Sequence, residues 1–298
     1  MRPHPLALTL LFSLTSAAQA QDKNFNLPEN PRIAFIGNTF VERDAEHGYL
    51  ETRLLLAFLD KDIIFRNLGW SGDTVRGEAR AGFGQPIDGF NRLARHVADL
   101  KPNLIFLNYG VNESWSGAAG LPAFDADLAK LLDALTKEGA QVAIFSIMAQ
   151  ENLGPPLPDP DTHNKDVRLY NDTLAKAAAA RGMRFVDLYD VPSAFAKANP
   201  GRHFTANEIH PTPAGFAFAA EQIAHRLGQP DRPWDDRAEK IRRLTVEKNR
   251  LYFHRWRPEN ETYIFGFRKK EQGQNAVEIP QFDPLVAAKE AEINAARK

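Results

Sequence analysis

Short apolar runs alternate with longer stretches of helical spacing between residues 32 and 228. Five short runs, mostly apolar and bounded by polar residues or glycine, predict strands at 33–36, 63–65, 104–107, 142–145 and 185–188. Continuous apolar runs suit strands that are buried on both faces of a parallel sheet. Five further stretches repeat apolar residues as a helix does, at 49–59, 90–100, 124–135, 167–180 and 214–227. The alternation predicts an α/β fold, a three-layer doubly wound sandwich with a mainly parallel five-stranded sheet.

Two segments interrupt this alternation. Residues 150–164 hold several prolines and no apolar periodicity, which indicates a loop, and we expect it on the rim of the site. Residues 229–298 lie beyond the expected end of the sandwich, with predicted helices at 235–251 and 287–298 and an extended aromatic and basic segment starting at 252–256. We interpret 229–298 as an extension packed on the core domain, 31–228, with a separate domain as the alternative. A dense polar and aromatic cluster in it indicates an ordered interface: Arg255, Trp256, Arg257, Glu261 and Tyr263.

The first twenty residues resemble a secretory signal. Arg2 supplies the positive start, residues 6–14 an apolar core, and Ala18-Gln19-Ala20 a small-x-small cleavage site. The apolar core is too short to span a bilayer. We expect an exported protein, periplasmic or secreted, with no transmembrane segment after cleavage; an uncleaved anchor is the alternative.

Composition narrows the chemistry. The chain has no cysteine, so it has no disulfides, thiol nucleophile or thiolate metal site. With 43% hydrophobic residues, it is long enough to bury a sizeable core without disulfides. Its 37 basic and 38 acidic residues nearly balance, which gives no electrostatic footprint for nucleic acid or an anionic membrane. No His, Asp and Glu cluster has metal-ligand spacing. We therefore expect a small-molecule or carbohydrate substrate, with no metal and no cofactor; the oligomeric state stays open.

Four polar segments lie where the predicted strands end. Gly37-Asn38-Thr39, residues 67–74 and residues 108–113 follow the first three strands, and residues 207–211 precede the last helix of the sandwich. Ligands of open α/β sheets bind at the carboxyl ends of the strands. The four segments are therefore expected to converge at one edge of the sheet.

In order and approximate spacing, these segments resemble the four sequence blocks of the SGNH (GDSL-type) hydrolases, a family of esterases and deacetylases. The resemblance covers residues 31–228. It implies an oxyanion hole formed by the N–H groups of Thr39 and Gly72 and the side-chain amide of Asn112, with His210 as general base. Two positions depart from the family pattern. Thr39 stands where the nucleophilic Ser is usual, and Asn207 stands where the Asp of the triad is usual.

Both departures weaken the expected chemistry. Threonine can attack an acyl carbon once a base removes its proton, but its methyl group stiffens the side chain and crowds the approach. Replacing the triad Asp by Asn costs a serine protease about 10⁴-fold in rate. Each of these residues also has an alternative, purely structural role. Thr39 would be a structural hydroxyl, and Gly72 and Asn112 would be turn residues. Ser71 and Ser114 are weaker candidates for the nucleophile.

Further residues are candidates for substrate binding. Aromatic rings at the rim suit stacking on sugar faces, although plain packing explains them equally well. The candidates are Asn38, Trp70, Trp115 and Asn207. Segment 42–47, with several charges and a histidine, is interpreted as a solvated helix start, and a role in orienting substrate is the alternative.

Together these observations predict an exported SGNH-type ester hydrolase that removes acetyl or other acyl groups from a carbohydrate or related ester. The alternative is a catalytically impaired scaffold that serves as a glycan-binding or interaction protein. Intact Gly72, Asn112 and His210 favour the hydrolase.

Overall fold

The computed structural model describes residues 25–258, 261–271, 273 and 275–298; the predicted signal segment, 1–20, lies outside them. The centre of the fold is a parallel five-stranded sheet, as predicted, and its strands lie in the order β2-β1-β3-β4-β5. Its strands are β1 (Arg32–Gly37), β2 (Ile64–Asn67), β3 (Leu104–Asn108), β4 (Gln141–Phe145) and β5 (Arg184–Val186).

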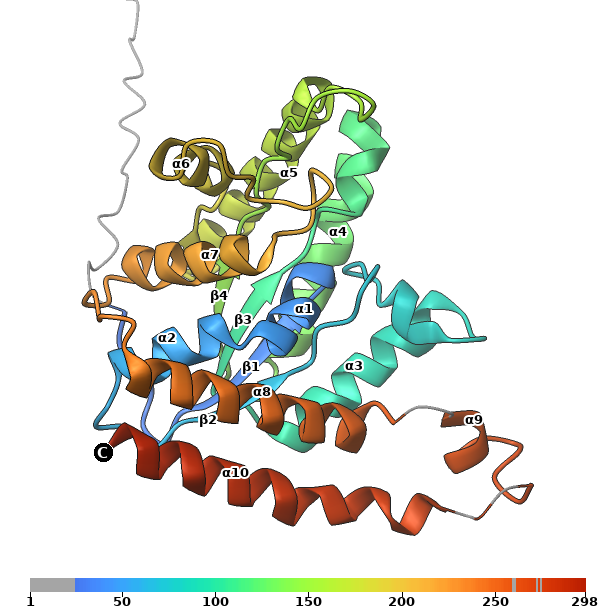
Figure 1. Cartoon of the computed structure of the whole chain (residues 1–298). Helices are drawn as coiled ribbons and strands as arrows, with labels where there is room; N and C mark the ends of the chain where they lie inside the picture. Colours follow the sequence, from blue (N-terminus) through green and yellow to red (C-terminus); the bar gives the residue numbers. More distant parts are fainter. Residues whose placement is uncertain (1–24, 259–260, 272, 274) are drawn as a thin grey trace, which may run out of the picture.

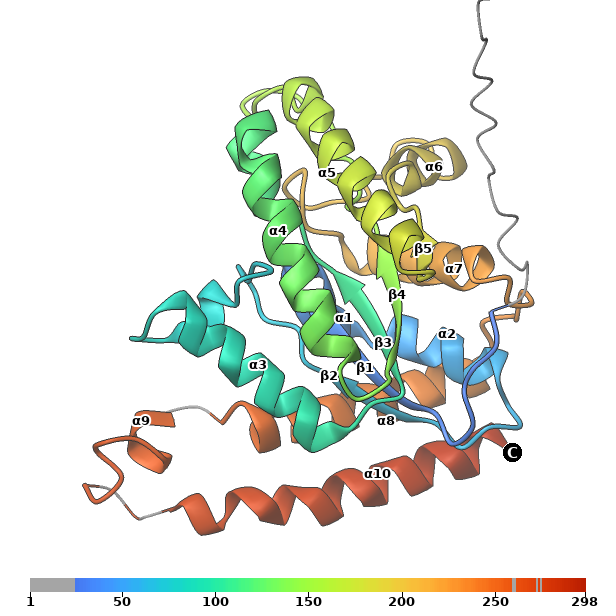
Figure 2. The same ribbon diagram turned by 180° about the vertical axis from the view of Figure 1, so that it is seen from behind.

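Helices cover both faces of the sheet, which gives the three predicted layers (Figures 1 and 2). One face packs against α1 (Thr39–His47), α2 (Tyr49–Ala57), α7 (Pro213–Arg226) and α8 (Asp236–Trp256). The other face packs against α3 (Pro86–Leu100), α4 (Gly117–Thr136) and α5 (Asp161–Ala180). The remaining helices are α6 (Val191–Ala198), α9 (Glu261–Ile264) and α10 (Phe282–Arg297), with short 3₁₀ turns at Glu78–Ala81, Glu113–Ser116, Asn275–Val277 and Ile279–Gln281.

Successive strand residues enter opposite halves of the core, which explains why the strand runs are apolar throughout. Ile33 and Phe35 of β1 join the half with α1 and α2, while Ala34 and Ile36 join the half with α3 and α4. Phe35 stacks between Phe65 and Phe106, with ring centroids 5.5 and 5.4 Å away. In β1, β3 and β4 nearly every residue is buried, so these runs show no polar alternation, whereas the edge strand β2 exposes Ile64 and partly exposes Arg66.

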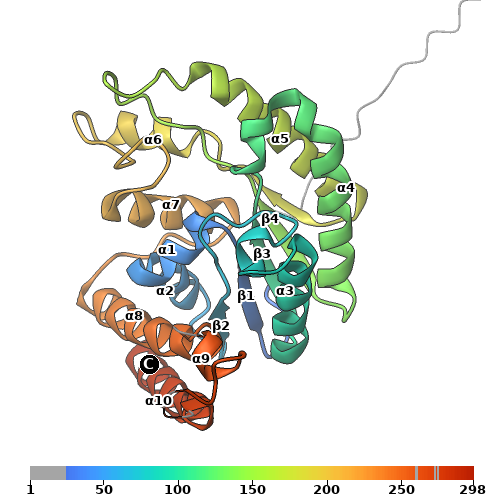
Figure 3. The ribbon, with the colours of Figure 1, turned by 90° about the vertical axis from the view of Figure 1, so that its right-hand side faces the viewer.

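The C-terminal residues add two long helices at the β2 edge of the sheet, where α8 and α10 lie side by side (Figures 1 and 3). Buried Lys248 of α8 pairs with Glu51 of α2 at 2.5 Å, and Glu290 of α10 pairs with Arg66 of β2 at 2.5 Å. Both helices therefore pack on the core through ion pairs as well as through apolar contacts.

The prediction of an extended segment at 252–256 is wrong, because α8 continues to Trp256. Tyr252 is buried and Trp256 follows one turn later, so both rings lie on the side of the helix that packs on the core. The aromatic and basic composition reflects this buried stripe, which short sequence runs do not distinguish from a strand. Helix α10 also begins at Phe282, earlier than the predicted residue 287.

Within the described residues, no helix is both long and apolar enough to cross a membrane.

Candidate functional site

Thr39 is the first residue of α1 and is separated from the end of β1 only by Asn38. Asn38 caps this helix, and its Oδ1 accepts the N–H of Phe40 at 3.3 Å. Gly37 is required beside it, because a Cβ there would clash with the Asn108 carbonyl. The Thr39 N–H belongs to the first helical turn, whose amide groups have no partner within the helix and carry partial positive charge. It is therefore suited to meet a developing negative charge.

Gly72 lies directly beside the Thr39 hydroxyl. Its N–H donates to Thr39 Oγ1 at 3.2 Å, across 33 positions of sequence. Its φ of 75° is a left-handed conformation that favours glycine. The structure thus brings together two of the three predicted oxyanion donors.

Asn112 connects the third block to the second. Its Nδ2 donates to the Asp73 carbonyl at 2.7 Å, which uses one amide proton and leaves the other. The Asp73 carboxylate is buried and accepts from Arg80 Nε at 2.5 Å and from the Tyr109 hydroxyl at 2.7 Å. This network holds the backbone that Asn112 contacts.

Glu113 makes a second link between these blocks. Its carboxylate accepts the Val75 N–H at 2.8 Å and the Gly110 N–H at 3.1 Å. Burial raises the pKa of Glu113 to about 7, although the backbone hydrogen bonds oppose the shift. Glu113 therefore ties the loop after β2, at Val75, to the loop after β3.

His210 lies in the loop before α7 and is oriented by Asn207. Its Nδ1 is 3.1 Å from Asn207 Oδ1 and 3.0 Å from Asn207 Nδ2, and Oδ1 also accepts the His210 backbone N–H at 2.9 Å. When Nδ1 carries the proton and donates to this oxygen, Nε2 is the free acceptor that a general base needs. Burial, followed by the charge of Arg43, lowers the pKa of His210. The ring is therefore neutral over a wider range of pH than an ordinary histidine.

A cavity of about 140 Å³ joins these blocks. Thr39, Asn112 and His210 all line it, whereas Gly72 is not part of its lining and reaches it only through the hydroxyl of Thr39. In the part of the chain that the structure describes, no hydrogen bond connects Thr39 Oγ1 to the His210 ring. Apolar side chains complete the walls: Phe40, Val111, Ile147, Met148, Ile209, Pro211 and Phe216.

The four predicted substrate-binding residues have different surroundings. Asn38 lines the cavity but is buried as a helix cap, and Asn207 holds the His210 ring. Trp115 lines the cavity, is 59% exposed and stacks on His163 at 3.7 Å between centroids. Trp70 does not line the cavity, because its ring packs against residues of the C-terminal extension.

Two charged residues of the cavity were not among the predicted site residues, although Arg43 belongs to segment 42–47, for which a role in orienting substrate was the alternative. Arg43 lies four residues after Thr39 and therefore on the same face of α1, a spacing that the sequence already contained. Glu208 lines the cavity next to His210, is buried and has a φ of 69°, a conformation that no local sequence signal predicts.

The serine alternatives are poorly placed for attack on a substrate. Ser114 is fully buried and bonds to the Val111 carbonyl at 2.8 Å and to His163 Nε2 at 2.9 Å. Ser71 is exposed, and its N–H donates to Glu42. Neither lines the cavity.

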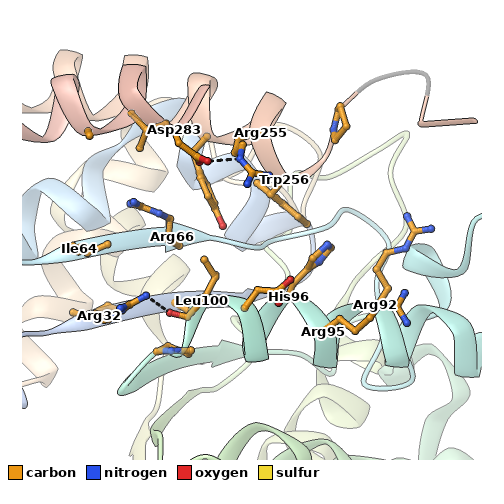
Figure 4. A pocket seen from close by; sticks show the side chains of 18 of the residues that line it. Arg32, Ile64, Arg66, Arg92, Arg95, His96, Leu100, Arg255, Trp256 and Asp283 are labelled. Atoms are coloured by element: carbon orange, nitrogen blue, oxygen red, sulfur yellow. Dashed lines mark hydrogen bonds and ion pairs between the residues drawn. The ribbon is translucent and has the colours of Figure 1, made fainter. Parts of the chain in front are cut away.

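A larger cavity, about 650 Å³, lies between α3, the strands β1 and β2, and the C-terminal helices (Figure 4). Its walls are charged, but pairs such as Arg255 with Asp283 at 2.8 Å and Arg92 with Glu261 at 2.7 Å neutralise much of the charge. It contains none of the motif residues. Among the described residues, no three His, Asp or Glu side chains are grouped to hold a metal ion.

Comparison with solved structures shows the same fold. A GDSL-like lipase from Parabacteroides merdae superposes with a TM-score of 0.57 at 16% identity, over 69% of this chain and 99% of its own. A gut microbial diltiazem-metabolizing enzyme gives a TM-score of 0.67 at 11% identity, over 93% of this chain and 97% of its own. A catalytic mutant of an acetylxylan esterase from Geobacillus stearothermophilus gives a TM-score of 0.52 at 19% identity, over 68% of this chain and 97% of its own.

Sequence comparison identifies the family. No curated protein matches the chain. The profile of the GDSL-like Lipase/Acylhydrolase family matches residues 35–218, more than half of the chain, and this span contains all four motif segments. The chain therefore belongs to the GDSL-like lipase/acylhydrolase family.

Proposed function

We propose that the protein is an exported ester hydrolase that removes acetyl or other short acyl groups from carbohydrate esters. The observation that carries this proposal is the convergence of Thr39, Asn112 and His210 on one small cavity. At about 140 Å³ it is well below the roughly 300–1,000 Å³ of sites that enclose drug-sized ligands. Such a space suits a short acyl group, with the alcohol part of the ester outside.

The reaction follows from the roles of these residues. His210 Nε2 removes the proton of Thr39 as Oγ1 attacks the carbonyl carbon, and the carbonyl oxygen becomes an oxyanion. The Thr39 N–H and the Asn112 amide stabilise it, and the Gly72 N–H, which donates to Thr39 Oγ1 in the structure, turns to it as Oγ1 bonds to the carbon, at about 3 kcal/mol for each donor. His210 then protonates the leaving alcohol, and water attacks the acyl-enzyme in the same way.

The alcohol side of the substrate is proposed from the cavity mouth. The exposed ring of Trp115 offers a flat apolar surface of the kind that stacks on sugar rings. The fold similarity to an acetylxylan esterase supports the same class of substrate.

Turnover of an aryl acetate and of acetylated xylo-oligosaccharides tests the proposal. Thr39→Ala and His210→Ala should each abolish hydrolysis, and Thr39→Ser should retain or increase it because the crowding methyl group is removed. Thr173→Ala, at a partly exposed threonine of α5 that lies outside the cavity, is the control and should have no effect.

Two outcomes would contradict the proposal. Unchanged hydrolysis in Thr39→Ala would show that Thr39 is not the nucleophile. A wild-type protein that binds glycans but turns over no acyl ester would instead support the binding-protein alternative.

A further inference from the structure

The C-terminal extension touches the catalytic blocks through Arg257, the residue that follows α8. Arg257 Nη1 pairs with Glu42 Oε1 at 2.7 Å, and Glu42 lies on α1 three residues after Thr39. The guanidinium carbon of Arg257 also lies 3.6 Å from the ring centroid of Trp70 in the second block. Arg257 therefore contacts the helix that carries Thr39 and the loop that carries Gly72.

Glu42 contacts both Arg257 and the loop that carries Gly72. Its second carboxylate oxygen, Oε2, accepts the N–H of Ser71. Ser71 is followed by Gly72, whose N–H donates to Thr39 Oγ1 at 3.2 Å. One carboxylate thus joins the extension to the residue beside the predicted oxyanion donor.

Backbone hydrogen bonds hold both ends of this turn, from the Trp70 N–H to the Gly37 carbonyl at 3.0 Å and from the Asp73 N–H to the Trp70 carbonyl at 3.1 Å, so the tip between them is the part that needs support. Ser71 and Gly72 are exposed, and a Cβ added at Gly72 would meet no atom within 4 Å. Packing therefore does not fix the direction of the Gly72 N–H, and backbone hydrogen bonds must do so. The side chains of Arg257 and Glu42 are 26% and 19% exposed, so their pair is partly shielded from solvent.

We propose that Arg257 is a positioning residue that fixes residues 70–72, and with them the Gly72 oxyanion donor. It fixes the Glu42 carboxylate, which as an ionised acceptor makes a strong hydrogen bond to the Ser71 N–H. It also lies over the ring of Trp70, which restrains the same loop through a second contact. The expected effect on catalysis rests on the proposed esterase function. The expected effect on the position of the loop rests only on the contacts described above.

Arg257→Ala, with Arg255→Ala as matched control, tests the role. Arg255 lies at the same end of α8 and makes a comparable 2.8 Å ion pair, but with Asp283 of α10. Two quantities are measured on the full chain: hydrogen exchange of the Ser71 and Gly72 amides by NMR, and kcat and KM for an aryl acetate.

Arg257→Ala should accelerate exchange at Ser71 and Gly72 and lower kcat by roughly 10- to 100-fold with little change in KM, since misplacement of a catalytic group costs rate rather than binding. Arg255→Ala should change neither quantity. Arg257→Lys should restore part of kcat, because it keeps the charge beside Glu42 but loses the planar contact with Trp70.

Unchanged Ser71 and Gly72 exchange in folded Arg257→Ala would overturn the proposal, as would an equal loss of kcat in Arg255→Ala or an effect on KM alone. Should Arg257→Ala not fold, Glu42→Gln tests the same link from the core side and should give the same exchange response. A wild-type protein without esterase turnover would reject the proposed function, while the exchange comparison would still decide the positioning role.

Discussion

At the scale of single residues, Asn207 shows which part of a triad carboxylate an amide can replace. Its side-chain amide orients the His210 ring, with Oδ1 at 3.1 Å and Nδ2 at 3.0 Å from Nδ1, and its Oδ1 also accepts the His210 backbone N–H at 2.9 Å. It has no negative charge, however, and so does not stabilise the imidazolium that forms during catalysis. Orientation is kept and charge stabilisation is lost, so we expect a slow esterase compared with a Ser-His-Asp relative.

The fall of activity at low pH, the acid limb of the pH–activity profile, should depend on the protonation of His210. A general base must be unprotonated, so activity falls as pH drops through the pKa of His210, and a lowered pKa places this limb below the ordinary value of about 6.5. Asn207→Asp should raise that pKa, move the limb to higher pH and increase kcat above it. Arg43→Gln should also move the limb to higher pH, because it removes a positive charge that lowers the pKa.

The pH dependence of kcat/KM for an aryl acetate measures these shifts, with Arg43→Lys as the control that keeps the positive charge. An acid limb at the same pH in wild type, Asn207→Asp and Arg43→Gln would show that His210 is not the base.

At the scale of elements, the attachment of α8 depends on a buried ion pair. Lys248 is 1% exposed and Glu51 4%, and the Lys248 ammonium also lies 3.4 Å from the Phe65 carbonyl. Burial lowers the pKa of Lys248, and Glu51 opposes this shift. A charge in this position is tolerated only with its partner.

Lys248→Met should therefore destabilise the whole protein by about 3–5 kcal/mol, because Glu51 is left buried and unpaired. The double variant Glu51→Leu with Lys248→Met should recover most of that loss, since no buried charge remains. Urea unfolding followed by circular dichroism measures both free energies.

Lys289→Met serves as the control, because its pairs with Glu247 and Glu292 lie at the surface and contribute little. If Lys248→Met left the unfolding of the core unchanged, residues 229–298 would have to be regarded as a separate domain.

At the scale of the whole molecule, we propose that the protein is exported and cleaved after Ala20. Expression of the full chain in a Gram-negative bacterium should give a periplasmic protein whose N-terminal residue is Gln21, as determined by N-terminal sequencing and intact mass. Ala20→Leu should block cleavage, because signal peptidase sites require a small residue there. A wild-type protein of full length in the cytosol would contradict the proposal.

Local sequence patterns predict much of the fold. The apolar runs predicted all five strands, because a strand covered on both faces carries its burial in consecutive residues. The placement of Thr39, Asn112 and His210 around one cavity was also predictable, since parallel strands end at the same edge of a sheet. These features depend on residues near one another in sequence or on the topology of the sheet.

Other features arise only when distant segments meet. Trp70 was expected at the substrate rim, but Trp256 at the end of α8 and Arg257 just after it pack against its ring, although they lie more than 180 positions later in the chain. The helical conformation of residues 252–256 follows from the burial of Tyr252, which the local pattern does not reveal. Sequence periodicity determines which residues are buried. The segments that bury them come together only in the folded chain, and the link from the C-terminal extension to Gly72 is one such contact.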